Sequence, residues 1–297
     1  MGGQVRQRSS RNREFRDERR GVSGQGPLRG ATVALVGAGN MGLAMLEGWA
    51  TQGLCGEQVV VVDPNPSQRL RDLCAVRGFA LTAEPRGGAR DAVVLAIKPQ
   101  MLEAGAAAAA PFTGSGSVVV SVIAGKRIVD ICSRLTAAQA VVRAMPNTPA
   151  AIGRGMTGAF ASPATNDAQR ALAHALLAAV GRVEWIESEE LIDAVTAVSG
   201  SGPAYVFYLV ECLAAAGVEA GLSPELAEKL ARATVEGAGE LLHRQGEASA
   251  QTLRERVTSP GGTTAAALGV LMADDGLAPL MARAVAAASK RAGELSG

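Results

Sequence analysis

The stretch Ala31-Thr-Val-Ala-Leu-Val-Gly37-Ala-Gly39-Asn-Met-Gly42 decides the fold of this chain. It joins an apolar, β-branched run to a Gly-x-Gly-x-x-Gly loop, and the helical pattern of residues 41–51 follows at once. Gly37 permits a tight turn, Gly39 lets the backbone approach a pyrophosphate, and Gly42 lets helix and strand pack closely. Phosphates held there meet the free N–H groups and the positive dipole end of the helix. The stretch therefore predicts the first strand, loop and helix of a dinucleotide-binding domain.

The alternation of strand and helix continues through the first half of the chain. Short apolar runs are separated by helical segments, which is typical of a parallel sheet covered on both faces. We therefore expect an α/β fold whose N-terminal domain, residues 30–165, is a Rossmann-type doubly wound sheet. The expected strands are 31–36, 59–62, 92–97, 118–122 and 141–145, and the expected helices are 41–51, 67–77, 100–110 and 128–135.

The second half of the chain, residues 166–297, is predicted to be helical, with one short strand at 183–186 as the exception. Several of its helices are rich in Ala and apolar around much of their circumference, and so small a domain has difficulty burying them alone. We therefore expect an all-helical domain that binds substrate and forms a homodimer or higher homo-oligomer. The expected helices are 166–180, 189–198, 203–216, 224–243, 248–257, 263–272 and 277–295.

The composition of the 297-residue chain argues against several kinds of partner. Aromatic residues make up only 3% and the net charge is +1, so nucleic-acid binding is not expected. The apolar stretches are short or interrupted, so no membrane span is expected. The four cysteines are scattered and there are two histidines, which argues against a metal site and favours a reducing, cytoplasmic location.

Residues 1–29 form a basic segment with few apolar residues, and their arginines cluster between Arg6 and Arg20. Such a segment buries too little surface to offset the entropy of ordering, so we expect a disordered tail. A transit peptide is the alternative, but Glu14, Asp17 and Glu18 argue against it.

Asp63 ends the second expected strand, about 20 residues after the glycine loop. A carboxylate at this place normally accepts the ribose hydroxyls and favours NADH, because the 2′-phosphate of NADPH would meet like charge. Asn65, Ser67 and Arg69 follow at once and could hold that phosphate. The two signals conflict, so the expected cofactor is NADPH or NADH.

Two further segments are expected to line the same crevice, because ligands bind outside the carboxyl ends of parallel strands. Ala96-Ile97-Lys98-Pro99 ends one strand, and Ser121-Val-Ile-Ala124-Gly125 ends the next. A solvated lysine that stops the strand is the alternative for Lys98.

The stretch Ser259-Pro-Gly-Gly-Thr263-Thr264 predicts an anion site in the helical domain. Pro-Gly-Gly cannot continue a helix, and Thr263 begins a new helical segment. Free N–H groups at that N-terminus, with the helix dipole behind them, suit a small carboxylate, and the two hydroxyls add donors. An ordinary helix cap with a Gly-rich approach is the alternative.

Six motifs, in this order along the chain, closely resemble those of the pyrroline-5-carboxylate reductase family. The likeness covers nearly everything from Ala31 to the C-terminus, and the last two motifs are the specific ones. The motifs are residues 37–42, 96–99 and 121–125, Arg143-Ala-Met-Pro-Asn147-Thr-Pro149, Ser199-Gly-Ser-Gly-Pro203-Ala-Tyr205, and residues 259–264.

The resemblance implies a helical domain that interlocks with a second subunit, and reduction of the cyclic imine pyrroline-5-carboxylate to L-proline by NADPH or NADH. One departure is Ala83, where relatives often place an Asn beside the adenosine. With the residues discussed above, the expected cofactor-binding set is Gly37, Ala38, Gly39, Asn40, Met41, Gly42, Asp63, Asn65, Arg69, Ile97, Lys98, Pro99, Val122 and Ala124. The expected substrate-binding set is Glu189, Ser259, Gly261, Gly262, Thr263 and Thr264, with Thr264 as the catalytic residue and no metal.

The absence of a histidine from every motif fits this activity. Oxidation of an alcohol generally needs a general base, whereas a protonated imine accepts hydride once it is positioned. A β-hydroxyacid dehydrogenase is one alternative, but Ser199–Phe207 lacks the lysine that such enzymes place there. A non-catalytic NAD(P)H-binding redox sensor is the other, and the predicted carboxylate site speaks against it.

Overall fold

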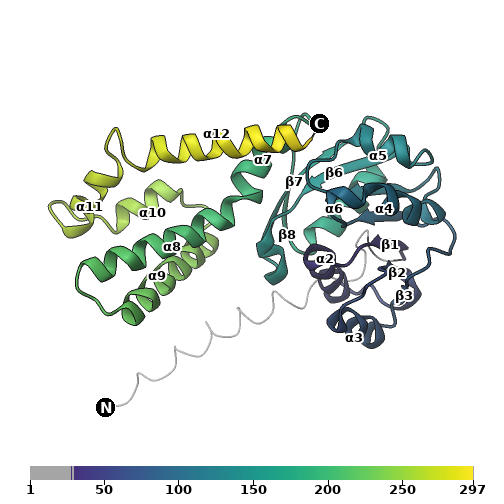
Figure 1. Cartoon of the computed structure of the whole chain (residues 1–297), viewed down its shortest axis with the longest axis horizontal. Helices are drawn as coiled ribbons and strands as arrows, with labels where there is room; N and C mark the ends of the chain where they lie inside the picture. Colours follow the sequence, from purple (N-terminus) through teal and green to yellow (C-terminus); the bar gives the residue numbers. More distant parts are fainter. Residues whose placement is uncertain (1–27, 29, 297) are drawn as a thin grey trace, which may run out of the picture.

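The computed structural model describes residue 28 and residues 30–296. They form two domains, one built on a sheet and one built of helices (Figure 1). The expected tail, residues 1–29, lies outside the described residues except for Leu28. That side chain is 6% exposed and packs in the core of the sheet domain, so Leu28 belongs to the folded domain and not to the tail.

An eight-stranded sheet organises the first domain, in the order β3-β2-β1-β4-β5-β6-β7-β8. β1 to β6 run parallel, β7 runs antiparallel to β6, and β8 runs parallel to β7. The order 3-2-1-4-5-6 is that of a doubly wound sheet, which confirms the expected fold class. The strands are β1 (Val33–Val36), β2 (Val59–Val62), β3 (Ala80–Thr82), β4 (Ala92–Leu95), β5 (Val118–Ser121), β6 (Ala140–Met145), β7 (Gly155–Ala161) and β8 (Gly181–Trp185).

Helices cover both faces of this sheet, because successive residues of a strand point to opposite faces. On one face, Leu35 shares a core with Trp49 of α2, whose indole N–H donates to the carbonyl of Leu176 in α6 at 2.8 Å. On the other face, Val36 shares a core with Leu102 of α4. The helices are α2 (Asn40–Thr51), α3 (Gln68–Arg77), α4 (Leu102–Ala109), α5 (Ile128–Arg134) and α6 (Asp167–Ala178), with short turns η1 (Gly56–Gln58), η2 (Pro99–Met101), η3 (Ala110–Phe112) and η4 (Thr148–Ile152).

Two strands of the sheet, β3 and β7, are not predicted by the sequence pattern. β7 reads Gly-Met-Thr-Gly-Ala-Phe-Ala, and Gly and Ala have low strand propensity. It forms because β6 pairs with it on one side and β8 on the other. Long-range pairing therefore decides this strand, not local preference.

The sheet extends past the expected domain boundary at residues 165–166. α6 contacts β5, β6 and β8, and β8, predicted as a short strand at 183–186, is the last strand of the sheet. The physical reason is that both elements bury their apolar residues against the sheet. We therefore propose that the sheet domain ends between Trp185 and Glu189.

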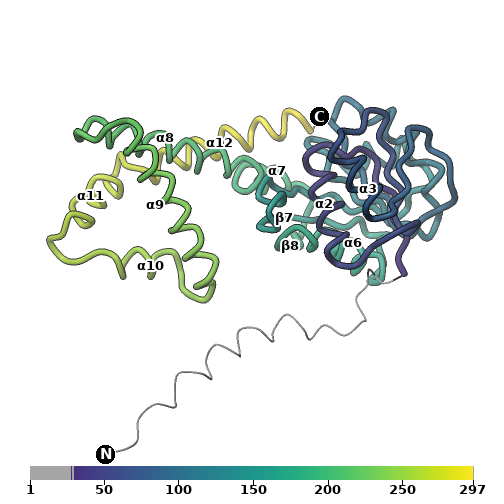
Figure 2. The backbone as a smooth tube through the Cα atoms, turned by 90° about the horizontal axis from the view of Figure 1, so that it is seen from below, coloured from purple at the N-terminus to yellow at the C-terminus, as the bar shows by residue number. Residues whose placement is uncertain are grey.

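From Leu191 onward the described elements are all helices, as predicted. α8 and α9 pack as a pair, with Gly217 close to Ala227. α12 runs back along the domain, and its C-terminal end lies against the sheet domain (Figures 1 and 2). The elements are α7 (Leu191–Val195), the π-helical turn η5 (Thr196–Gly200), α8 (Gly202–Glu219), α9 (Pro224–Arg244), α10 (Ala250–Arg256), α11 (Thr263–Leu271) and α12 (Leu277–Leu295).

Large apolar side chains remain exposed on these helices. Phe207 and Tyr208 of α8 are 63% and 65% exposed, and Leu241 of α9 is 52% exposed. Large apolar side chains exposed together on neighbouring helices are typical of binding surfaces. The surface is therefore available to pack against a second copy of the chain.

Candidate active site

The glycine loop lies between β1 and α2, at the carboxyl edge of the sheet. Gly37 has φ +83°, and a Cβ there would lie only 2.5 Å from Cγ2 of Ile97. A Cβ at Gly42 would collide with the carbonyl oxygen of Gly37. At Gly39, by contrast, a Cβ would meet no atom within 4 Å. Packing therefore requires Gly37 and Gly42, whereas Gly39 faces the open space that a pyrophosphate needs.

The segments that follow β4 and β5 lie at the same carboxyl edge of the sheet as the glycine loop. The N–H of Ala96 donates to the carbonyl of Val36 at 2.9 Å, and that of Val122 donates to the carbonyl of Leu95 at 3.0 Å. These bonds place the loops side by side. Five predicted cofactor residues therefore share the edge with the glycine loop, namely Ile97, Lys98, Pro99, Val122 and Ala124.

Asp63 holds the glycine loop to the end of β2. Its Oδ2 accepts a hydrogen bond from the backbone N–H of Ala38, and its Oδ1 accepts one from that of Asn65, both at 2.9 Å. This ordering role was missed at the sequence level, because the spacing of Asp63 suggested only a ribose contact. The ribose contact itself remains a prediction.

Arg69, predicted to hold a phosphate, is paired with Glu47 across α3 and α2. Its Nε and Nη2 donate to the two carboxylate oxygens, both at 2.9 Å. The pair borders a cavity of about 320 Å³ beside α2, and the Arg69 side chain stays 69% exposed. The residues lining the cavity are Asn40, Met41, Leu43, Ala44, Glu47, Arg69, Thr148 and Ala151.

The predicted anion-binding turn leads into α11, and the helix begins at Thr263 as expected. Gly261 has φ +70°, and the N–H of Gly262 donates to the carbonyl of Ser259 at 3.1 Å. A Cβ at Gly262 would lie 2.6 Å from Oγ of Ser259. The turn thus presents the N-terminus of a helix, with the hydroxyls of Thr263 and Thr264 in its first turn. Its substrate-binding role remains a prediction.

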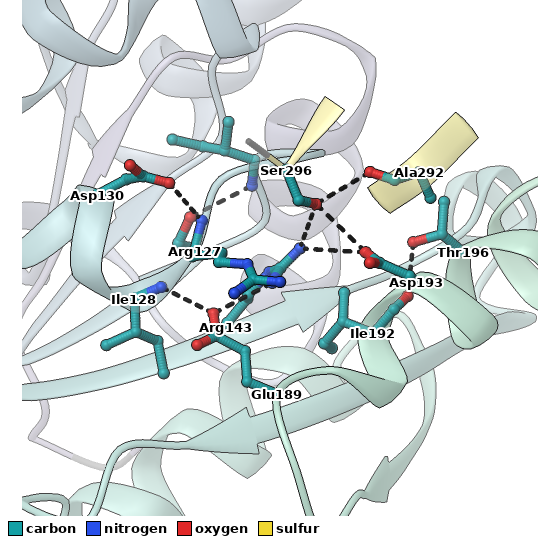
Figure 3. Close-up of polar contacts among 12 residues, drawn as sticks. Arg127, Ile128, Asp130, Arg143, Glu189, Ile192, Asp193, Thr196, Ala292 and Ser296 are labelled. Carbon is teal, nitrogen blue, oxygen red and sulfur yellow. Dashed lines mark hydrogen bonds and ion pairs between the residues drawn. The ribbon is translucent and has the colours of Figure 1, made fainter. Parts of the chain in front are cut away.

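Glu189 lies at the root of the helical domain and not at this turn. Its Oε1 accepts hydrogen bonds from Nη1 of Arg143 at 3.1 Å and from the backbone N–H of Ile128 at 2.8 Å (Figure 3). The Arg143 side chain is only 4% exposed. The sequence pattern missed this ion pair, although an arginine inside a buried strand signals a partner, since buried charges are paired. The substrate contact expected of Glu189 is a prediction still.

Within one chain, the glycine loop and the anion-binding turn do not come together. Both views place α11 at the end of the helical domain far from the sheet (Figures 1 and 2). The structure thus gathers most of the predicted cofactor residues at the sheet edge and most of the predicted substrate residues at the α11 turn. The two halves of the candidate site belong to different domains.

The two histidines lie on helices that contain none of the predicted site residues. His174 of α6 stacks on Trp185 with ring centroids 6.4 Å apart, and His243 lies in the last turn of α9. In the described part of the chain, no three His, Cys, Asp or Glu side chains are grouped as metal ligands.

A doubly wound sheet with a glycine loop at its carboxyl edge, followed by a helical domain, is the architecture of an NAD(P)-dependent oxidoreductase. A family model described as pyrroline-5-carboxylate reductase dimerisation matches residues 189–295. A second, described as NADP oxidoreductase, coenzyme F420-dependent, matches residues 32–125. The first match covers most of the helical domain, and the second covers the strands around the glycine loop.

The pyrroline-5-carboxylate reductase of Pseudomonas aeruginosa is 40% identical, over 89% of this chain and 96% of that protein. A pyrroline-5-carboxylate reductase structure from Coxiella burnetii is 36% identical, with a TM-score of 0.82, covering 90% of this chain and 99% of that one. The Plasmodium falciparum pyrroline carboxylate reductase structure, with NADP bound, is 26% identical with a TM-score of 0.72 and covers 90% and 98%. This chain belongs to the pyrroline-5-carboxylate reductase family, which confirms the resemblance of its motifs.

One helical run, Leu191–Glu219, is long and apolar enough to cross a membrane by length and composition alone. The run lies inside the part that matches the dimerisation model. We therefore expect its apolar surface to contact a second copy.

Proposed function

We propose that the protein reduces L-1-pyrroline-5-carboxylate to L-proline with NADPH or NADH, a step of proline biosynthesis. The observation that carries the proposal is a family relationship that spans both domains and includes both the glycine loop and the α11 turn. The test is steady-state oxidation of NADPH and NADH, compared side by side, with the imine as substrate. No oxidation with either cofactor would contradict the proposal.

The chain's own residues fit a bound dinucleotide. The N-terminus of α2 and the open face of Gly39 would hold the pyrophosphate, while Asp63 keeps the loop in place. The loops that contain Lys98 and Val122 would hold the nicotinamide end. Once bound, the reduced nicotinamide supplies a hydride. Asn65 and Arg69 follow Asp63 closely in sequence and would be the groups to meet a 2′-phosphate, so we propose that either cofactor can be used.

The α11 turn would hold the substrate carboxylate on its free N–H groups, and the N–H of the protonated imine would donate to the hydroxyl oxygen of Thr264. Hydride adds to the imine carbon, and the electron pair of the C=N bond moves onto the nitrogen, which already carries its proton. The site therefore has to position its substrate more than to move a proton. Neither histidine belongs to the glycine loop, to the segments after β4 and β5 or to the α11 turn, which agrees with this mechanism.

We propose further that the two halves of the site come from two subunits. The α11 turn of one copy would lie at the cofactor edge of the other, which explains why the halves are apart in one chain. The exposed apolar helices and the match to a dimerisation family support this arrangement.

The alternatives make different predictions. In a β-hydroxyacid dehydrogenase, the first long helix after the cofactor domain would carry a lysine, and here Ser199–Phe207 forms η5 and the start of α8 without one. A redox sensor would bind NAD(P)H without oxidising it in the presence of the imine.

We also propose a cytoplasmic location, because all four cysteines are free thiols, as in reducing compartments.

A further inference from the structure

A buried cation joins the two domains at their root. Arg143 of β6 bonds Glu189, which precedes α7, and its Nη2 lies 3.4 Å from Oγ of Ser296 and 3.8 Å from Oδ1 of Asp193 (Figure 3). Ser296 in turn donates to Oδ1 of Asp193 at 3.3 Å. The helical domain leaves the sheet at α7 and returns to it at the end of α12. The guanidinium of Arg143 therefore contacts both chain connections between the two domains.

The same cluster reaches the loop that follows β5. The Glu189 oxygen that pairs with Arg143 also accepts from the N–H of Ile128, the first residue of α5. At the other side of that loop, a Cβ at Gly125 would lie 2.8 Å from the carbonyl oxygen of Leu295, so the end of α12 packs directly on it. The loop assigned to the nicotinamide end of the cofactor is thus held from both sides by helical-domain residues.

A second contact between the two domains lies just beyond β6, the strand that contains Arg143. The amide nitrogen of Asn147 donates to the carbonyl and to the hydroxyl of Ser199, at 3.1 and 3.2 Å, and its oxygen accepts from the N–H of Met156 at 2.8 Å. Ser199 lies in η5, and π-helical turns are frequent at functional sites. β6 and the loop after it therefore contact the helical domain at two places close in sequence.

We propose that Arg143 is a positioning residue, which sets the angle of the helical domain relative to the cofactor edge. The proposal rests on the function proposed above, in which the α11 turn of one subunit completes the cofactor edge of its partner. A small rotation at the root is then magnified at α11, which lies at the far end of the domain. Misplacement of reacting groups by 1 Å can cost about 100-fold in rate.

The variant Arg143→Lys tests this role, because it keeps the charge but loses the planar fork that reaches Glu189, Asp193 and Ser296 together. We expect single-turnover hydride transfer to slow by at least about tenfold. The dissociation constant of the cofactor should stay within about twofold, since the glycine loop is untouched. The matched control is Arg154→Gln, which breaks an ion pair of 3.5 Å between the two domains whose partners, Arg154 and Glu240, are 41% and 42% exposed. The control should transfer hydride at the wild-type rate.

A purely structural role would lower the melting temperature of Arg143→Lys and leave its rate unchanged, and this result would overturn the proposal. If Arg143→Lys does not form dimers in sedimentation, Ser296→Ala decides in its place. That milder variant should slow hydride transfer about two- to fivefold, and a wild-type rate would overturn the proposal.

Hydrogen–deuterium exchange gives a readout that does not depend on activity. In Arg143→Lys the amides of α7 and of the last turn of α12 should exchange faster, whereas in Arg154→Gln they should not. Unchanged exchange in Arg143→Lys would overturn the proposal. Failure of the wild type to reduce the imine would instead contradict the proposed function, and unchanged exchange in Arg143→Lys would still overturn the role of Arg143.

Discussion

The carboxylate of Asp63 is hydrogen-bonded to the backbone N–H of Ala38 at 2.9 Å, and this contact ties the end of β2 to the glycine loop. Its second oxygen is engaged by the N–H of Asn65. Asp63, the acidic residue expected after the second strand of this fold, thus orders the loop that would bind the pyrophosphate. Its negative charge lies at the expected place of the ribose, so we expect the residue to influence both the strength and the selectivity of cofactor binding.

Asp63→Asn should weaken binding of NADH by about tenfold, because an amide keeps only one acceptor oxygen for two backbone N–H groups. Binding of NADPH should weaken less, since removal of the negative charge relieves repulsion of the 2′-phosphate. Fluorescence titration with both cofactors measures the two dissociation constants. The control is Asp91→Asn, because Oδ2 of Asp91 accepts hydrogen bonds from the backbone N–H and the hydroxyl of Thr32 at the other end of the sheet, at 2.7 and 2.8 Å. That control should lower stability without changing either constant, and equal weakening of both cofactors by Asp63→Asn would contradict the charge argument.

Substitutions within the glycine loop should separate binding from folding. Gly39→Asp should raise the dissociation constant of the cofactor at least about tenfold, because it places a carboxylate where the pyrophosphate lies. It should leave the melting temperature unchanged, because a Cβ at Gly39 meets open space. Gly37→Ala should instead destabilise the fold by about 1–3 kcal/mol, through its φ of +83° and the collision with Ile97. Wild-type cofactor affinity in Gly39→Asp would remove the assignment of the loop.

Thr264→Val should lower turnover of pyrroline-5-carboxylate by about 10- to 150-fold, the effect of losing one hydrogen bond to a charged group. Cofactor affinity should change little, because the cofactor residues lie on the sheet domain. Thr252→Val, in α10, is the control and should have wild-type kinetics. Pyrroline without the carboxylate should be a poor substrate, and it should be far less sensitive to Gly262→Val than the acid is. Efficient reduction of that analogue would move the search for the substrate site to Glu189 and Ser199–Tyr205.

Phe207→Asp should produce monomers, because it places a charge on the exposed apolar surface of α8. Sedimentation should show the change in mass, cofactor titration should remain normal, and imine reduction should be lost. Val76→Asp is the control, since Val76 is an exposed apolar residue of the sheet domain, at 80%. It should remain a dimer. A fully dimeric Phe207→Asp would show that α8 is not part of the contact.

The sequence predicts those features that depend on local pattern. The β-branched run of β2 matches its predicted bounds at Val59–Val62, and the Pro-Gly-Gly sequence correctly predicts where α11 begins. The features that were missed depend on residues far apart in sequence. β7 is a strand only because β6 and β8 pair with it, and Glu189 acquires its ion pair only when the fold brings Arg143 beside it. Likewise, the distance in sequence between Asp63 and the glycine loop predicts that Asp63 lies at the end of β2, but not that it bonds the loop.

The central claim, a site formed by two subunits, is tested most directly by mixing two impaired variants. Gly39→Asp should lack a working cofactor half, and Thr264→Val should lack a working substrate half. Co-expression of the two in equal amounts gives hybrid dimers in which one site combines both intact halves. We predict that imine reduction returns to about a quarter of the wild-type rate per protein, the share expected for random pairing in a symmetric dimer. If each site lay within one chain, every site would keep one defect, and activity no higher than that of the separate variants would contradict the account.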